Sequence, residues 1–159
     1  MGANCSLGLP PVPTLDHAER EIKDLHEFFT AWYSGAERYE KMDEKEKDVA
    51  FQSFTDRFHS DFEYVMPSGK KFSKRMILDL RQVYGTSPDF KIKIENVKMK
   101  HVPFSGGRVI SGTYKEFQTG AKNSTTNNGR HTTVVFLAHP SSGKYGLQWS
   151  TLFFVSGSS

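Results

Sequence analysis

The sequence has little cysteine and tryptophan and no long apolar run. Cys5 is the single cysteine among 159 residues, so no disulfide can form within one chain, which favours a reducing compartment. No apolar run approaches the length that crosses a bilayer, and the first residues lack the basic start and apolar centre of a secretory signal. These absences predict a cytoplasmic protein.

The charge balance is nearly even, with 21 Lys and Arg against 18 Asp and Glu and a net charge of +3. Four lysines alternate along one predicted strand: Lys91, Lys93, Lys98 and Lys100. They indicate a solvated strand face, or alternatively a surface that meets anionic lipid head groups. Nucleic acid is not an expected partner, because no aromatic stacking platform accompanies these lysines.

The first six residues, MGANCS, fit an N-myristoylation pattern, with Gly2 as the acceptor once Met1 is removed and Ser6 four positions on. One myristoyl chain holds a protein to a bilayer only marginally, and Cys5 is well placed for a second, palmitoyl chain. The prediction is a lipoprotein with peripheral contact to the cytoplasmic face of a membrane. The alternative is a leader that is never acylated.

The composition, 36% hydrophobic and 13% aromatic, predicts one globular domain. A Gly- and Pro-rich leader is expected over residues 1–13 and a short disordered tail over residues 156–159. The domain between them, residues 14–155, is long enough to bury a real core.

Helices are predicted in the first half of the domain. Apolar residues recur at steps of three and four over residues 14–34, with Asp16 and Glu19 as a capping box and Gly35 at the end. A second helix is expected over residues 43–59. A short strand then precedes a third helix, expected over residues 73–85.

The second half is predicted to be all strand, joined by loops rich in Gly, Ser and Asn that leave no room for crossover helices. The sheet should therefore be antiparallel, with strands over residues 90–102, 108–118, 130–139 and 145–155.

Two strand patterns depart from simple alternation. The first strand switches its apolar parity near Glu95 and Asn96, which predicts a β-bulge that bends the sheet. The last strand is apolar on both parities, at Leu147, Trp149, Phe153 and Val155 and then at Leu152 and Phe154. We therefore expect both of its faces to be covered, one by the helices and the other by a partner chain, most simply a second copy.

The order of these elements carries a resemblance to a known family. The two clearest stretches are FHSDFEYVMPSGKKFSKRMILDL, a strand and turn before a helix, and NNGRHTTVVFLAHPSSGKYGLQWSTLFF, with the pattern G-R-x-T-x-V-F before a final strand. Together they resemble the nuclear transport factor 2-like superfamily, including SnoaL-like domains, over residues 14–155. The resemblance implies an α+β cone: three N-terminal helices on a strongly curved antiparallel sheet, an apolar pocket, and a convex face that forms a homodimer.

Candidate site residues are few. Glu116 and His131 are the candidate proton carriers; the alternative is a rim carboxylate and a polar strand end. They share a face only if even-numbered residues of one strand oppose odd-numbered residues of the next, and the loop 120–129 is too long to fix that parity. The candidate ligand-pocket residues are Tyr33, Tyr64, Tyr114 and Trp149. No H-x-H or C-x-x-C spacing occurs, so neither a metal nor a cofactor is expected.

The resemblance leaves two functions open, because the superfamily contains both enzymes and non-catalytic domains. The favoured one is a non-catalytic dimeric cone that binds a small apolar ligand or a protein partner, tethered by acylation. The alternative is a small cofactor-independent lyase or isomerase using acid–base catalysis. An enzyme needs at least two titratable groups that converge inside a dry pocket, whereas an adaptor would have the pocket filled by Phe and Leu side chains.

Overall fold

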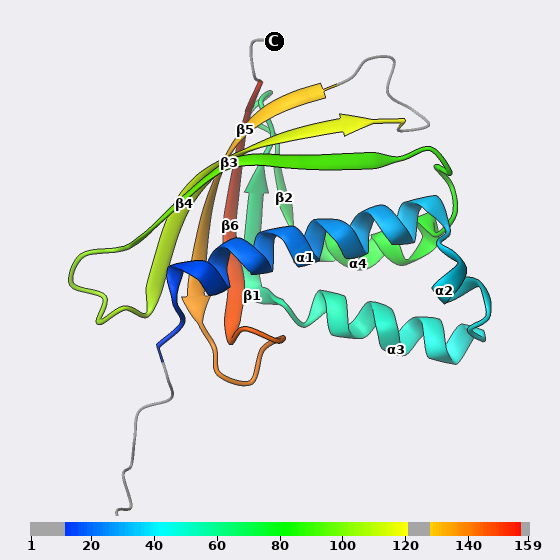
Figure 1. The fold of residues 1–159 in the computed structure, drawn as a ribbon, viewed down its shortest axis with the longest axis horizontal. Coiled ribbons are helices and arrows are strands. Elements are labelled where there is room, and N and C mark those ends of the chain that lie inside the picture. Colours follow the sequence, from blue (N-terminus) through cyan, green and yellow to red (C-terminus); the bar gives the residue numbers. More distant parts are fainter. Residues whose placement is uncertain (1–11, 121–127, 157–159) are drawn as a thin grey trace, which may run out of the picture.

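The helices lie within the curve of a single sheet (Figure 1). The computed structural model describes residues 12–120 and 128–156. The helices, in chain order, are α1 (Leu15–Ser34), α2 (Glu37–Glu40), α3 (Glu44–Thr55) and α4 (Lys74–Asp79), the last followed by a 3₁₀ turn, η1 (Leu80–Val83). Helix α2, a single turn, was not predicted.

Helix α1 confirms the predicted first helix but not its cap. The Thr14 hydroxyl accepts a hydrogen bond from the backbone N–H of His17, and the His17 ring accepts one from the N–H of Thr14. The predicted capping box of Asp16 and Glu19 is wrong, because Asp16 already lies inside the first turn and pairs with Arg20. Thr14 is the residue with extended backbone, so its side chain can reach the free N–H groups of that turn.

Helix α3 begins as expected and ends early. The Asp43 side chain accepts from the N–H of Glu46, and the Glu46 side chain accepts in return from the N–H of Asp43. The helix ends at Thr55 rather than at residue 59. The carbonyl of Arg57 accepts from the N–H of Trp149 at 2.9 Å, so the chain has already joined the sheet there and cannot continue as a helix.

Two glycines bring the end of α1 against the end of the third helical region. Gly35 ends α1 with a φ of 70°, as predicted, and the N–H of Gly85 donates to the carbonyl of Trp32 at 3.0 Å. A Cβ on Gly35 would lie 3.0 Å from the Cα of Gly85, so the close approach requires glycine. The helix expected over residues 73–85 is not one continuous α-helix. It consists of α4 followed by the 3₁₀ turn η1.

The sheet has six strands in the order β2-β1-β6-β5-β4-β3. Strands β3 to β6 form the predicted antiparallel meander, but β1 pairs with β6 in parallel, which corrects the expectation of a purely antiparallel sheet. Strand β2 was not predicted; it pairs with β1 across the turn of residues 67–70. The bounds are β1 (Phe58–Val65), β2 (Lys71–Ser73), β3 (Lys91–His101), β4 (Val109–Thr119), β5 (Asn128–Ala138) and β6 (Leu147–Ser156).

Irregularities in two strands bend the sheet and set which residues face inward. The β3–β4 register shifts between Glu95 and Lys98, and Asn96 has a φ of 53°, which confirms the predicted bulge. In β6, Trp149 pairs with Phe136 and Thr151 pairs with Val135. Ser150 is therefore an extra residue, and every side chain after it changes face.

The β6 bulge corrects the interpretation of the last strand. Leu152 and Phe154 are buried at 7% exposure each, while Phe153 and Val155 are 47% and 49% exposed. The mixed parity of this strand thus arises from the bulge and not from two covered faces. A second copy against the outer face stays a prediction.

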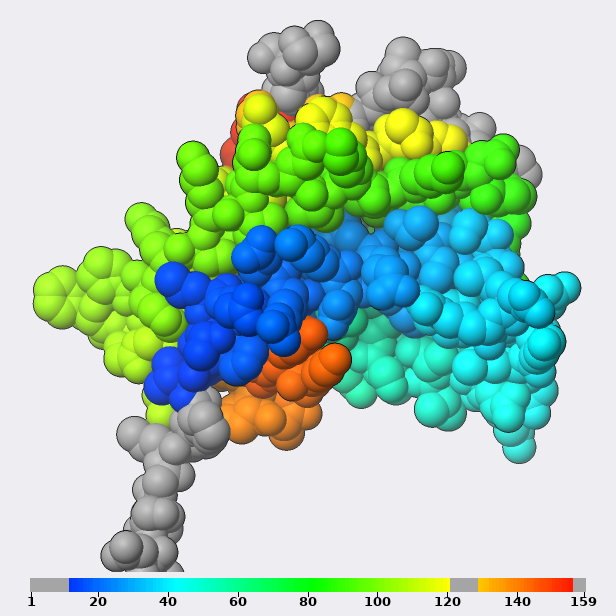
Figure 2. Space-filling view, in the orientation of Figure 1, coloured from blue at the N-terminus to red at the C-terminus, as the bar shows by residue number. Residues whose placement is uncertain are grey.

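Aromatic rings fill the space between α1, α3 and the sheet. The ring centroids of Phe28 and Phe54 are 4.7 Å apart, and those of Phe136 and Trp149 are also 4.7 Å apart. Figure 2 shows the first half of α1 (blue) between β3 (green) above it and the β5–β6 loop (orange) below it. Tyr145 of that loop donates to Asp24 at 2.8 Å. The helix is therefore held at both edges, which fixes its inner face against the strands.

Candidate functional site

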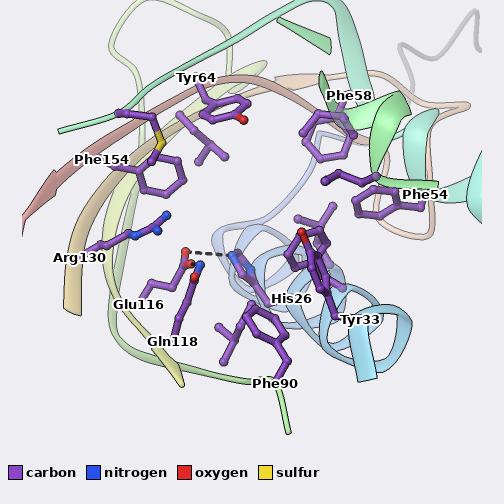
Figure 3. A pocket seen from close by; sticks show the side chains of 17 residues that line it. His26, Tyr33, Phe54, Phe58, Tyr64, Phe90, Glu116, Gln118, Arg130 and Phe154 are labelled. Atoms are coloured by element: carbon purple, nitrogen blue, oxygen red, sulfur yellow. Dashed lines mark hydrogen bonds and ion pairs between the residues drawn. The ribbon is translucent and has the colours of Figure 1, made fainter. Parts of the chain in front are cut away.

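A cavity of about 280 Å³ lies between α1, α4 and the inner face of the sheet. Most of its wall is apolar, and the polar groups gather on one side, where β4 and β5 meet α1 (Figure 3). The lining residues are Leu25, His26, Phe29, Tyr33, Phe54, Phe58, Tyr64, Met66, Ile77, Leu80, Phe90, Ile92, Glu116, Gln118, Arg130, Leu152 and Phe154.

His26 and Glu116 meet in the wall of this cavity. His26 comes from the middle of α1 and Glu116 from β4, and their side chains are 10% and 3% exposed. The Nε2 atom of His26 lies 3.2 Å from Oε2 of Glu116, and its Nδ1 atom lies 2.7 Å from the carbonyl oxygen of Ile22. A buried imidazole and a buried carboxylate are thus in direct contact beside an apolar space.

The two contacts of His26 fix where its protons lie. A carbonyl oxygen only accepts, so Nδ1 of His26 carries a hydrogen and donates to Ile22. The contact between Nε2 and Glu116 then needs one further proton, held by one of these two atoms. The pair can therefore hold or release a single proton at the cavity wall while Nδ1 stays occupied.

The carboxyl of Glu116 favours its ionised form. Burial on its own raises the pKa of Glu116, but the hydrogen bond and charge of His26 oppose it, followed by the hydrogen bond from Gln118 and the charge of Arg130. The net effect lowers the pKa of Glu116. In the protonated pair the shared proton consequently sits on His26, which makes an imidazolium beside a carboxylate.

Strand register places two more polar residues beside Glu116. Glu116 is directly opposite Arg130 on β5, so the two side chains share the inner face. The Gln118 amide donates to Oε1 of Glu116. The guanidinium carbon of Arg130 lies 5.3 Å from the centre of the Phe154 ring, and the side chain is partly buried.

Two of the predicted pocket residues line the cavity. Tyr33 comes from the last turn of α1 and Tyr64 from β1, on the side of the cavity away from Glu116 (Figure 3). Burial raises the pKa of Tyr33; burial, and then the neighbouring Tyr33, raise that of Tyr64. Both hydroxyls therefore stay protonated near neutral pH and can donate to a bound molecule.

The other two predicted pocket residues, Tyr114 and Trp149, support the site from behind and do not line the cavity. Their rings meet the His26 ring edge-on, at centroid distances of 5.6 and 6.1 Å. The Tyr114 and Thr132 hydroxyls are buried, and neither has a hydrogen-bond partner of good geometry in the described part of the chain. Burial raises the pKa of Tyr114 well above its usual value. These side chains exclude water from the inner side of His26.

A second buried charge anchors Trp149. Glu21 is 1% exposed and its Oε1 accepts from Nε1 of Trp149 at 2.9 Å and from Nε of Arg57 at 2.7 Å. Arg57 also donates to the backbone carbonyl of Glu21 at 3.3 Å. This triad joins α1, the start of β1 and β6, and it fixes the indole that packs on His26.

His131 lies on the other side of the sheet. It pairs with Lys115 and Val155, is exposed, and shares the outer face with them. A Glu116–His131 pair is therefore excluded. The partner of Glu116 is His26, which the sequence analysis did not select, and Gln118 and Arg130 were also missed. The available signal was the position of His26, one turn after Ile22, at the edge of the apolar stripe of α1.

Other sequence predictions meet the structure only in part. Gly2 and Cys5 lie outside the described residues, as do most of the leader and the tail. Within residues 12–120 and 128–156, no helix is long and apolar enough to cross a membrane. In the same residues no three His, Cys, Asp or Glu side chains come together as ligands for a metal ion.

Comparison with known proteins identifies the fold. No family model matches the sequence, and no curated protein matches it. An NTF2-like protein of unknown function from Pseudomonas aeruginosa is similar in structure, with a TM-score of 0.67, 24% identity, and coverage of 89% of this chain and 99% of that one.

Two further solved structures share the architecture at lower identity. One is a nuclear transport factor 2-like superfamily protein from Salmonella enterica, with a TM-score of 0.56, 12% identity, and coverage of 92% of this chain and 95% of that one. The other is a hexachlorocyclohexane dehydrochlorinase from Novosphingobium barchaimii, with a TM-score of 0.56, 14% identity, and coverage of 91% and 90%. At these identities a shared fold is what the likeness establishes. The chain has the nuclear transport factor 2-like fold, an α+β cone of helices within a curved and mostly antiparallel sheet.

Proposed function

We propose that the protein is a cofactor-independent lyase or isomerase that moves a proton to and from a small, largely apolar substrate. The observation that carries this proposal is the contact between His26 and Glu116 in the wall of an apolar cavity. Two titratable groups converge where an adaptor would have only Phe and Leu side chains.

The proposed reaction begins with the pair in its protonated form, an imidazolium beside a carboxylate. Glu116 takes a proton from a substrate carbon next to a carbonyl group, through a lone pair of Oε2 that His26 does not occupy, and the electrons of the broken C–H bond move into that carbonyl. The N–H at Nε2 of His26 donates to Oε2 at 3.2 Å and holds the carboxylate in place. Nδ1 stays bound to Ile22 throughout, which keeps the ring oriented.

Two outcomes complete the reaction. Return of the proton to another carbon gives an isomer, and loss of a leaving group from the neighbouring carbon gives an elimination. The apolar wall keeps water away from the carbanion-like intermediate, and Tyr33 and Tyr64 can donate to the carbonyl oxygen. The dehydrochlorinase with the same fold is an enzyme, which supports catalysis on this scaffold without assigning its substrate to this chain.

The test is proton exchange between substrate and solvent. The protein is incubated in D₂O with small ketones, thioesters and β-substituted carbonyl compounds, and deuterium uptake and elimination products are followed by NMR and mass spectrometry. Glu116→Gln should lower the rate by about 100-fold or more, because general base catalysis contributes that much. His26→Asn should also lower the rate, because the carboxylate then loses the charged donor that holds it in place.

A matched control uses the second histidine on the sheet. His131→Asn makes the same chemical change on the outer face, away from the cavity, and should leave the rate unchanged. Equal rates in the wild type and His26→Asn, or no exchange on any compound above the buffer rate, would overturn the proposal.

The second candidate function is binding without turnover, in a dimer held at a membrane. The apolar majority of the cavity wall favours it, since such a wall binds apolar ligands whether or not chemistry follows. It is supported if ligands bind with micromolar affinity while no compound exchanges protons.

A further inference from the structure

The guanidinium of Arg130 faces the cavity and lies against an aromatic ring. Its neighbours on the inner face are Glu116 on the adjacent strand β4 and Phe154 on β6. Ion pairs occur at many Arg and Lys residues of the described chain, such as Arg57 and Arg81, but none of those pairs includes Arg130. A guanidinium at an apolar cavity is costly to desolvate unless an anion matches it.

Glu116 does not serve as that anion. Its Oε2 is bound to His26 and its Oε1 to Gln118, so its charge is already matched inside the wall. The protonated His26–Glu116 pair carries no net charge, because one imidazolium balances one carboxylate. With Arg130 added, the groups on the polar side of the cavity together carry one net positive charge.

We propose that Arg130 anchors the carboxylate of a small monoanionic substrate in this cavity. The planar guanidinium can donate two parallel N–H bonds to a carboxylate, a geometry that a lysine ammonium lacks. The inference names the substrate class of the proposed function and rests on it for the claim of turnover; the binding of the anion can be measured by itself.

The rest of the cavity selects the body of that molecule. The wall opposite Arg130 includes Phe54 and Phe58, which pack well against a ring or a branched chain (Figure 3). A cavity of about 280 Å³ is at the small end for ligand sites. The ligand class is therefore a monocarboxylic acid with one ring or a short branched chain.

The probes are phenylacetate and phenylacetamide, which have nearly the same shape and differ in charge. Calorimetric titration of the full chain should show phenylacetate binding about tenfold more tightly or better, the gain expected of a charge-assisted hydrogen bond. Arg130→Met should remove this preference and leave the binding of phenylacetamide within about threefold. Arg130→Lys should keep part of the preference, since it keeps the charge and loses the fork.

Lys115→Met is the control for long-range charge. Lys115 is on the outer face of β4, one residue from Glu116, so its loss removes the same charge from the same sheet without touching the cavity. The preference should persist in this variant. Equal affinity for the two probes in the wild type, no detectable binding of phenylacetate at millimolar concentration, or a preference that survives Arg130→Met would overturn the inference.

The outcomes also separate this inference from the proposed function. An Arg130-dependent preference for the anion, with no proton exchange on any compound, keeps the carboxylate site and overturns catalysis. Proton exchange on neutral ketones that needs His26, with no preference for phenylacetate, keeps catalysis and overturns the carboxylate site.

Discussion

Removal of the Arg57 guanidinium should destabilise the fold far more than removal of a surface arginine. Arg57→Met keeps the length of the side chain but leaves the Glu21 carboxylate, 1% exposed, with only the Trp149 indole as a side-chain partner. Breaking a buried ion pair by removing one partner costs about 3–5 kcal/mol. At about 2–4 °C per kcal/mol for a chain of this size, the melting temperature should fall by roughly 6–20 °C.

The second step of this prediction tests the reason for the loss. Glu21→Gln in the Arg57→Met background removes the stranded charge and keeps an oxygen to accept from Trp149. The double variant should therefore be more stable than Arg57→Met alone, by about 1–3 kcal/mol, since an uncompensated charge costs more than a neutral amide. Simple additivity of the two substitutions would mean that the charge is not the cause.

Urea unfolding followed by tryptophan fluorescence measures these differences, with two-state behaviour checked against circular dichroism. Arg20→Met is the matched control, because Arg20 pairs with Asp16 on the surface, where both side chains are more than 60% exposed. Such a pair contributes at most about 0.5 kcal/mol. If Arg57→Met costs no more than Arg20→Met, the buried triad does not stabilise the protein as argued.

Three further predictions concern the site, the outer face and the N-terminus. The pKa of Glu116 is lowered in the folded state, so its contribution to stability is present at neutral pH and is lost as the pH falls through the folded-state pKa. The difference in unfolding free energy between wild type and Glu116→Gln should therefore shrink from pH 7 towards pH 3. Urea unfolding at each pH measures this difference. If a second copy covers the outer face, light scattering should give twice the mass of one chain, and Phe153→Lys with Val155→Lys should halve it, since these two side chains are about half exposed there; a monomeric wild type would refute the dimer. In a eukaryotic host the chain should sediment with membranes, Gly2→Ala should release it and Cys5→Ser should weaken the attachment, while a wild type found wholly in the supernatant would refute acylation.

Local patterns in the sequence predicted the local parts of the fold. The periodicity of α1, the glycine at its end and the parity switch at Asn96 each depend on neighbours within a few residues, and the structure has all three. The parallel pairing of β1 with β6 depends on segments about ninety residues apart, and no local pattern encodes it. The short strand β2 was missed because three residues are too few for any alternation to be recognised.

The same limit explains which site residues could be predicted. Glu116 could be predicted as a candidate because a carboxylate in an apolar pocket can take and return a proton. His131 was its expected partner, but the length of the loop between the two strands leaves open which residues lie opposite each other. The observed register puts His131 on the opposite face of the sheet. His26 was missed because it becomes a candidate only through its contact with Glu116, ninety positions away in the sequence. A histidine beside the apolar stripe of a helix is otherwise ordinary.

The bulge at Ser150 links the least regular strand to the site itself. Before the bulge, Leu147 and Trp149 face inward, and Trp149 supports His26 from behind. After it, Leu152 and Phe154 face inward and line the cavity, and the guanidinium of Arg130 packs against the ring of Phe154. Without the extra residue, Phe154 would turn outward and Arg130 would lose the surface that holds it. The apolar residues at both odd and even positions of the last strand thus have one cause. The bulge lets a single strand contribute both the support behind His26 and part of the cavity lining.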